Sequence, residues 1–237
     1  MLHKRCQWPL LVVLLLCLSV VLPSDSIFAQ AGSNYGRVFG YGYASPQSIF
    51  GVYGATTTPW SPSIDQPAQF DASPTGMANG DGSVTMEAGG MKWCWDYNPN
   101  ACAVSPFVSW RDPAGNGVLG IHYWVTFPSD SWQWYMVVNT GNGCYQGDWW
   151  NGYAWDGLND PAETCFGIGF DAVATGAESS DIGLATGRAN AYYDQLWSTD
   201  TWNWNQWCWV NPYANMPNWF IYPNPCYLNY VWSFAGW

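Results

Sequence analysis

The chain has 237 residues, and its 17 aspartates and glutamates outnumber its 6 lysines and arginines, which gives a formal net charge of −11 at pH 7. This charge repels phosphate groups, so we expect neither nucleic acid nor an anionic membrane as a partner. Aromatic residues make up 19% of the chain, which is too many for an intrinsically disordered protein.

The first residues resemble a secretory signal peptide. Lys4 and Arg5 precede an apolar stretch from Leu10 to Leu22, and Ala29-Gln30-Ala31 provides small residues for cleavage. The apolar stretch is shorter than the roughly 20 residues of a membrane span, and no second one follows. We therefore expect a secreted, soluble monomer divided into a signal peptide (1–31), a glycine-rich lead-in (32–50) and one domain (51–237).

Disulfides are expected in an exported protein with these cysteines. Two of the eight cysteines, Cys6 and Cys17, lie in the signal peptide, and an even number remains: Cys94, Cys102, Cys144, Cys165, Cys208 and Cys226. They allow up to three disulfides, in more pairings than the sequence can choose between. Because Cys94 and Cys102 are close in sequence, we predict that these two are bonded.

The pattern of the mature chain predicts short strands. Gly/Pro/Asn turns separate them, as at Asn79-Gly80-Asp81-Gly82, and apolar residues do not recur at helical spacing. The chain is therefore expected to be all-β, an antiparallel sandwich or barrel. The predicted strands, in order, are 48–58, 83–90, 107–110, 120–127, 132–139, 166–174 and 190–197, with residues 32–42 as a loose lead-in or first edge strand.

Tryptophan is unusually abundant, and all but one of the 19 tryptophans follow residue 31. In Trp202–Trp209 they alternate with polar residues, so one face of that strand would be almost entirely indole. Two interpretations stay open: packing of a sandwich core around disulfides, or an aromatic platform for sugar or an extended peptide.

Several kinds of catalytic site are excluded by the residues that are absent. His122 is the only histidine after residue 31, and no G-x-S-x-G motif accompanies it. Zinc sites need two or more His or Cys ligands, and the cysteines are expected to be oxidised. There is no phosphate-binding loop and no dinucleotide fingerprint. We therefore expect no metal and no cofactor.

Carboxylate chemistry remains. Glu87, one of three glutamates with Glu163 and Glu178, lies in a β-prone run followed by Gly89 and Gly90, where a substrate backbone could approach. Two carboxyl groups of different pKa hydrolyse a bond without histidine or metal, since one draws a proton from water and the other donates one. This logic serves peptidases and glycosidases alike. The alternative is that Glu87 is an ordinary solvated strand residue.

The order of short motifs resembles the neprosin-domain family of secreted glutamic peptidases. The similar segments are Gly51–Thr56 with Trp60-Ser61-Pro62 and Gln69-Phe70, Met86–Gly90, Phe107–Asp112, Ala174–Gly187 with Ala191-Tyr192-Tyr193, and Pro225-Cys226-Tyr227. Met86–Gly90 resembles the family motif "I-E-A-G-W", whose glutamate is one of two catalytic carboxylates. The resemblance implies a β-sandwich with a groove, and it implies a catalytic role for Glu87.

The second catalytic glutamate of that family lies in a "W-G-G-E" strand that would fall at residues 165–171. Asp171 stands where the glutamate is expected, and Glu163 and Glu178 flank the strand as alternatives. We take Asp171 as the predicted partner of Glu87. The candidates for lining the substrate groove are Gly89, Gly90, Trp110 and Trp134.

These observations predict a secreted, acid-active endopeptidase that cleaves extracellular polypeptides with a carboxylate pair centred on Glu87. The alternative is a catalytically inactive relative that acts as an aromatic-rich module binding carbohydrate or cell wall. A third reading is a structural exported protein whose aromatic strands serve only for packing.

Overall fold

The structure is a computed structural model. It describes residues 36–43, 49–58, 70–79, 84–94, 102–129, 131–158, 163–180, 190–198, 203–206, 211–214, 220–222 and 230–234. The predicted signal peptide, the Asn79–Gly82 turn beyond its first residue, and most of Trp202–Trp209 lie outside these ranges. The division of the chain into signal peptide, lead-in and domain stays a prediction.

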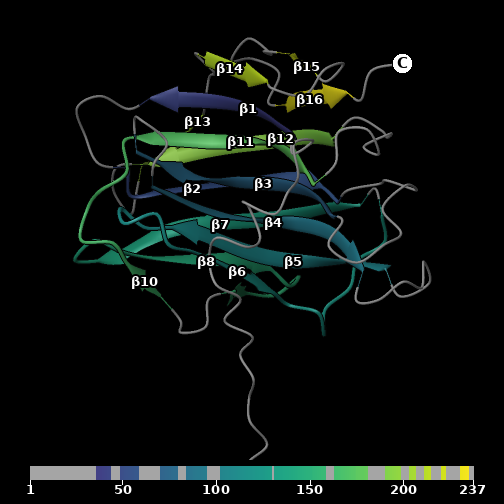
Figure 1. Ribbon diagram of the computed structural model, residues 1–237, viewed down its shortest axis with the longest axis horizontal. Coiled ribbons are helices and arrows are strands. Elements are labelled where there is room, and N and C mark those ends of the chain that lie inside the picture. The colour runs from purple at the N-terminus through teal and green to yellow at the C-terminus, as the bar shows by residue number, and fades with distance from the viewer. Residues whose placement is uncertain are drawn as a thin grey trace, which may run out of the picture.

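The described residues form two antiparallel sheets, which confirms the predicted all-β sandwich (Figure 1). The strands of the first sheet, in spatial order, are β14 (Asn211–Ala214), β1 (Gly36–Tyr43), β11 (Ala172–Ser179), β3 (Phe70–Ala78), β4 (Thr85–Cys94), β5 (Cys102–Arg111) and β6 (Gly117–Ile121). β1 comes from the predicted lead-in and pairs along its whole length with β11.

The second sheet contains the remaining nine strands. Along its main path these are β10 (Thr164–Cys165), β8 (Cys144–Trp150), β7 (Trp132–Gly141), β2 (Gly51–Thr57), β12 (Asn190–Ser198), β16 (Tyr230–Phe234) and β15 (Phe220–Tyr222). β13 (Asn205–Gln206) pairs with β12, and β9 (Trp155–Gly157) pairs with β8.

The main core lies between the two sheets. Because side chains alternate along a strand, each sheet turns one set of residues inward. The inward residues that form one buried cluster are Met77, Met86, Ala88, Val108 and Val173 of the first sheet and Val52, Tyr135, Val137 and Tyr145 of the second. The neighbours of Met86 and Ala88 on β4 therefore point to the outer face of the first sheet.

The bounds of several predicted strands differ in the structure: 48–58 is Gly51–Thr57, 83–90 is Thr85–Cys94 and 107–110 is Cys102–Arg111. Two other predicted strands are mostly irregular. The segment 120–127 continues as a strand only to Ile121, because the Val125 N–H turns back to the His122 carbonyl. The segment 166–174 enters its strand only at Ala172. Before that, the N–H of Phe166 donates to the Gly143 carbonyl and the Phe170 carbonyl accepts from the Ile49 N–H, so local contacts replace regular pairing.

Two disulfides fasten the sheets. Cys94–Cys102 joins facing positions of β4 and β5, which confirms the predicted pair, and Cys144–Cys165 joins β8 to β10. Cys208 and Cys226 lie outside the described residues. Among the described residues, no helix is long and apolar enough to cross a membrane.

Candidate functional site

Glu87 lies near the centre of the outer face of the first sheet. On β4 its neighbours Met86 and Ala88 pack into the core, so alternation directs Glu87 outward. It is nevertheless only 3% exposed. A buried carboxylate costs free energy unless it is hydrogen-bonded or charge-compensated, so this position needs specific support.

Ser109 supplies part of that support. The registers place Glu87 between Gly76 on β3 and Ser109 on β5. The Ser109 hydroxyl, itself buried, donates a hydrogen bond to Oε2 of Glu87 over 3.3 Å. A hydroxyl donor to a carboxylate favours the ionised form and restricts its rotamers.

Gly76 supplies the space. A Cβ added to Gly76 would lie 2.7 Å from Cγ of Glu87 and 2.3 Å from the Met86 carbonyl oxygen. Only glycine therefore fits opposite Glu87, whose side chain lies against the backbone of β3. The two hairpin neighbours of Glu87 thus have separate roles, since glycine gives room and serine gives a hydrogen bond.

The residues on the two sides of Glu87 on this outer face differ in size and polarity. Toward β11 the residues in register with Glu87 have small side chains or none, first Gly76 on β3 and then Ala174 on β11. Toward β6 the face is apolar, and a second cluster contains Phe70, Ala72, Met91 and Phe107 with the partly buried Trp93, Leu119 and Ile121 packed against it. Leu119 is the register partner of Ser109, so an apolar side chain follows directly after the Glu87–Ser109 pair.

Glu178 is the second buried glutamate on this sheet. It lies on β11, is 2% exposed, and stands opposite Ala72 of β3, which in turn stands opposite Met91 of β4. Because Met91 and Glu87 are four residues apart on one strand, Glu178 shares the outer face with Glu87. It is displaced from Glu87 by about 13 Å along the strands, at roughly 3.3 Å per residue, with β3 between them. The two carboxylates therefore do not touch in this structure.

Asp171, the predicted partner, immediately precedes β11 at its other end. Its N–H donates to the Ala78 carbonyl over 3.3 Å, and its side chain is exposed. The nearest register line runs from Ala172 through Ala78 to Thr85, two residues before Glu87 on β4. The carboxyl group thus lies at the rim of the sheet that contains Glu87, accessible to solvent.

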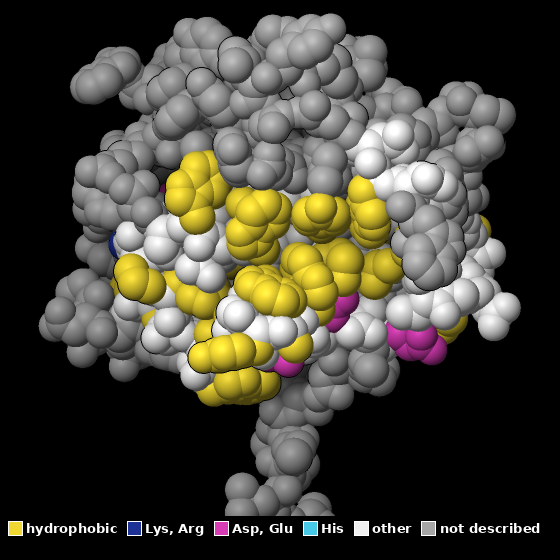
Figure 2. All heavy atoms as spheres, turned by 180° about the vertical axis from the view of Figure 1, so that it is seen from behind, with side chains coloured by type: hydrophobic (Ala, Val, Ile, Leu, Met, Phe, Trp, Pro, Cys, Tyr) yellow, Lys and Arg dark blue, Asp and Glu magenta, His cyan; other side chains and the backbone are white. Residues whose placement is uncertain are grey.

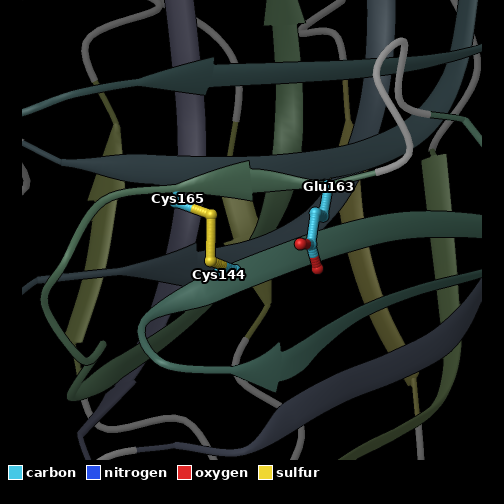
Figure 3. Close-up of side chains that lie close together, drawn as sticks. All are labelled: Cys144, Glu163 and Cys165. Carbon is cyan, nitrogen blue, oxygen red and sulfur yellow. A yellow bond between two sulfur atoms is a disulfide. The ribbon is translucent and has the colours of Figure 1, made fainter.

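Glu163, the other alternative, belongs to the second sheet. It is exposed, its carboxylate accepts a hydrogen bond of 2.5 Å from the Thr140 hydroxyl, and it stands beside the Cys144–Cys165 disulfide (Figure 3). Its carboxylate and the two sulfur atoms lie within 4.8 Å of one another. Because both sulfurs are bonded to each other, neither is a thiolate that could ligate a metal. This cluster is therefore a disulfide bond with a neighbouring carboxylate, not a metal site.

The four residues predicted to line a groove are divided among three surfaces. Gly89 shares the outer face with Glu87, and a Cβ there would lie 2.4 Å from the Ser73 carbonyl oxygen, so its glycine serves the close approach of β3. Gly90 has the inward alternation of Met86 and Ala88. Trp110 packs against the core and Phe166, and Trp134 contacts Tyr53 of the second sheet.

Sequence reasoning did not identify Ser109 or Gly76, although a signal for Ser109 was present. The predicted Cys94–Cys102 bond, extended back along a hairpin, sets residue 87 opposite residue 109. Counting outward from this bond would have found Ser109. A turn spanning residues 79–82 would instead set residue 87 opposite residue 74, whereas the structure sets it opposite Gly76, because the Asn79 N–H pairs with the Val84 carbonyl.

Comparison with known proteins indicates the fold. No family model and no curated protein matches the sequence. Among solved structures, the chain is similar to scytalido-glutamic peptidase with a peptide-based transition-state analogue (TM-score 0.54, 10% identity) and to the same peptidase with a transition-state analogue inhibitor (TM-score 0.53, 11% identity). It is also similar to SCP-B, a member of the Eqolisin family of peptidases, in complex with the tripeptide Ala-Ile-His (TM-score 0.50, 10% identity). Each similarity covers 85% of this chain and 98% of the other. The chain thus shares the fold of glutamic peptidases.

Proposed function

We propose that the protein is an exported endopeptidase that hydrolyses polypeptides in acid, with Glu87 as the central carboxylate of its active site. One observation carries the proposal: a glutamate is buried and hydrogen-bonded by Ser109 at the centre of a sheet whose fold is that of glutamic peptidases. Structural residues rarely bury a carboxylate in this way, because its desolvation is costly.

The second carboxylate is expected to come from β11 or its beginning. Asp171 is exposed at the rim of the sheet, where a substrate can reach it, whereas Glu178 shares the outer face with Glu87 and is buried. Glu163 lies on the second sheet, so we assign it no part in the chemistry. Asp171 remains the proposed partner, and Glu178 is the alternative.

The chemistry requires only the two carboxyl groups and water. The ionised carboxylate takes a proton from water as the water oxygen forms a bond to the scissile carbonyl carbon, while the neutral carboxyl group donates its proton to the carbonyl oxygen. The tetrahedral species then breaks its C–N bond. The leaving amine takes the proton that the first carboxylate gained from water, and a hydroxyl proton of the tetrahedral species returns to the second carboxylate, so both groups regain their starting states. Acid pH is expected because one carboxyl group of the pair must be neutral.

Export is supported by the leader-like sequence of residues 1–31 and by the two disulfides, which persist in oxidising surroundings. The expected partner is therefore an extracellular polypeptide. Carbohydrate binding, the alternative that the tryptophan content indicates, concerns the other sheet.

The test is digestion of an unfolded protein at about pH 3 to 5, where carboxyl groups exchange protons, with products identified by mass spectrometry. We expect cleavage by the mature protein and a loss of about a hundredfold or more in Glu87→Gln, since general acid–base groups contribute roughly 10²–10⁴-fold. Asp171→Asn and Glu178→Gln decide between the two partners, because only the true partner should produce a comparable loss. Glu163→Gln is the matched substitution at a distant glutamate and should retain the rate.

Equal digestion by wild type and Glu87→Gln would remove Glu87 from the chemistry. No digestion by the wild-type protein across this pH range would overturn the peptidase proposal itself.

A further inference from the structure

The outer face of the second sheet carries exposed aromatic side chains that the proposed peptidase site does not use. Register places Tyr53, Met136, Asp148 and Gly157 side by side on β2, β7, β8 and β9. Alternation then directs neighbouring tryptophans to the same side, while Val52, Tyr135 and Val137 point into the core. We call this surface the aromatic face; it comprises Tyr53, Trp132, Trp134, Trp150, Trp155 and Trp204.

Five of the six rings of the aromatic face, all but Trp132, form a connected layer. Tyr53 is its centre, with ring centroids 6.1 Å from Trp134, 6.3 Å from Trp155 and 4.8 Å from Trp204. Trp150 and Trp155 form a cross-strand pair with centroids 5.6 Å apart. The mutual contacts hold the indoles in place, so a ligand would meet an ordered surface.

These rings remain in contact with solvent. Trp132 is 47% exposed, and Trp150 and Trp155 are each 36% exposed. Seen from behind, hydrophobic side chains form a broad band over the molecule with acidic side chains beside it (Figure 2). Contiguous exposed apolar surface of this kind marks an interaction site, because scattered single residues are what ordinary surfaces show.

Polar groups lie among the rings. Nε2 of Gln146 donates to Oδ1 of Asp148 over 2.6 Å, and Nδ2 of Asn151 donates to Oδ2 of Asp156 over 2.6 Å. Asp148 is only 3% exposed, and this burial raises its pKa. The hydrogen bond from Gln146 lowers the pKa, and the negative charge of Asp156 raises it further. A purely apolar partner would exclude water from the remaining donor and acceptor sites of the half-buried Gln146, which is unfavourable.

The charge of the aromatic face excludes further classes of ligand. Among the described residues of this face there is no lysine or arginine, whereas Asp148 is acidic, and the chain as a whole carries −11. Nucleic acids, anionic lipid surfaces and acidic glycans are therefore repelled. A neutral polyhydroxylated ligand satisfies both kinds of group, since its C–H faces stack on indoles and its hydroxyls bond to amides and carboxylates.

We infer that the aromatic face binds a neutral polysaccharide chain, at a site separate from the Glu87 face. The rings spread over four strands, β2, β7, β8 and β9, which is about 14 Å across at roughly 4.8 Å per strand. That span fits a chain of several sugars rather than a single one. An exported peptidase would thereby be held on an insoluble matrix while its other sheet acts on polypeptides.

The experiment measures binding of defined hexasaccharides to the mature protein by isothermal titration calorimetry and tryptophan fluorescence. The neutral probes are cellohexaose, laminarihexaose and chitohexaose; the comparison probes are an anionic galacturonate hexamer, a cationic glucosamine hexamer and phosphatidylcholine vesicles. We expect saturable binding of at least one neutral probe and of none of the comparison probes.

Variants locate the site. The double variant Trp150→Ala/Trp155→Ala should weaken binding at least tenfold. Trp124→Ala is the matched control, because Trp124 is 70% exposed and lies just after β6 of the first sheet, and it should bind within twofold of wild type. Glu87→Gln should bind as wild type does, and the double variant should digest a soluble polypeptide as wild type does. The variants therefore test carbohydrate binding and peptidase activity separately, so either proposal can fail without the other.

The inference is overturned if no neutral probe binds, if the double variant binds as tightly as wild type, or if vesicles or a charged probe bind instead. Thermal unfolding checks that the variants are folded. If the double variant is not, the more exposed Trp132→Ala replaces it, with the same tenfold loss expected and undiminished binding counting against the site.

Discussion

The outer faces of the two sheets differ in the size and the exposure of their side chains. Around Glu87 the first sheet has glycine, alanine and serine in close register, and its acids Glu87 and Glu178 are almost fully buried. The second sheet presents large aromatic rings to solvent and has polar groups between them. One face has the burial and hydrogen bonding that chemistry requires, and the other has the exposed area that recognition requires. The two proposals therefore place reaction and attachment on opposite faces of one sandwich.

The largest expected effect tests how closely the first face is packed. Gly76→Ala would drive a Cβ to 2.3 Å from the Met86 carbonyl oxygen, and backbone atoms cannot yield as a flexible side chain can. We expect a destabilisation of about 3 kcal/mol or more, in the upper range for overpacking, measured by denaturant unfolding. Gly120→Ala on β6 is the control, because the nearest atom is 3.4 Å away and little should change. Equal stability of the two variants would show that β3 and β4 are not held this closely.

The two disulfides allow the sheets to be loosened one at a time. Cys144–Cys165 closes a sequence separation of 21 and Cys94–Cys102 one of 8. Chain entropy predicts losses of about 3 and about 2.5 kcal/mol when each pair is replaced by alanine. Only the loss of Cys94–Cys102 should also reduce peptidase activity, because that bond holds the β4–β5 hairpin on which Glu87 and Ser109 meet. The measurement is unfolding and digestion of both double variants. An equal loss of activity in the two would mean that the hairpin is held by its other contacts.

A smaller effect tests the hydrogen bond to Glu87. Ser109→Ala removes the hydrogen-bond donor from a buried carboxylate, so we expect the free energy of unfolding to fall by about 1 to 3 kcal/mol. We also expect the pH–activity profile to shift toward higher pH, because the ionised form of Glu87 is less favoured without the donor. Ser105→Ala is the matched control. Ser105 lies on the same strand and face, is fully buried, and its hydroxyl makes no hydrogen bond among the described residues. A pH profile unchanged in Ser109→Ala would make the serine a packing residue only.

The smallest effect belongs to the aromatic face. Burial raises the pKa of Asp148, so the folded state holds its proton more tightly than the unfolded state does. Stability therefore falls as pH rises from the unfolded pKa through the raised one, because ionisation of the buried group is unfavourable. Asp148→Asn should remove this fall and raise the melting temperature near pH 7 by at most a few degrees, as a change of around 1 kcal/mol does in a chain of this size. A variant that melts below wild type at pH 7 would show that the ionised carboxylate is stabilising.

Much of the structure around Glu87 could be predicted from the sequence. The β4 and β5 strands, the Cys94–Cys102 pair and the alternation of Met86–Ala88 are local features, and a hairpin register follows from its turn and its bond. The position of Glu178 on the same face could not be predicted, because β11 pairs with β3 across about a hundred residues of chain. No local pattern specifies which distant strand completes a sheet.

The tryptophans show the same limit. Their number indicated both core packing and a ligand platform, and alternation could not decide which face of a strand turns inward until the second layer was in place. Tyr135 and Tyr145 are buried in the core, whereas Trp132 and Trp155 face solvent.

The all-β class, the hairpins and one disulfide could be predicted from the residue pattern, because they depend on turns, alternation and short loops. The packing of the two sheets was needed to show that Glu87 is buried, that Glu178 shares its face at a distance, and that Trp132, Trp150 and Trp155 are exposed on the other sheet. These facts depend on which strands pair and which faces meet. Burial between distant segments sets them, since it is a property of the whole packed molecule.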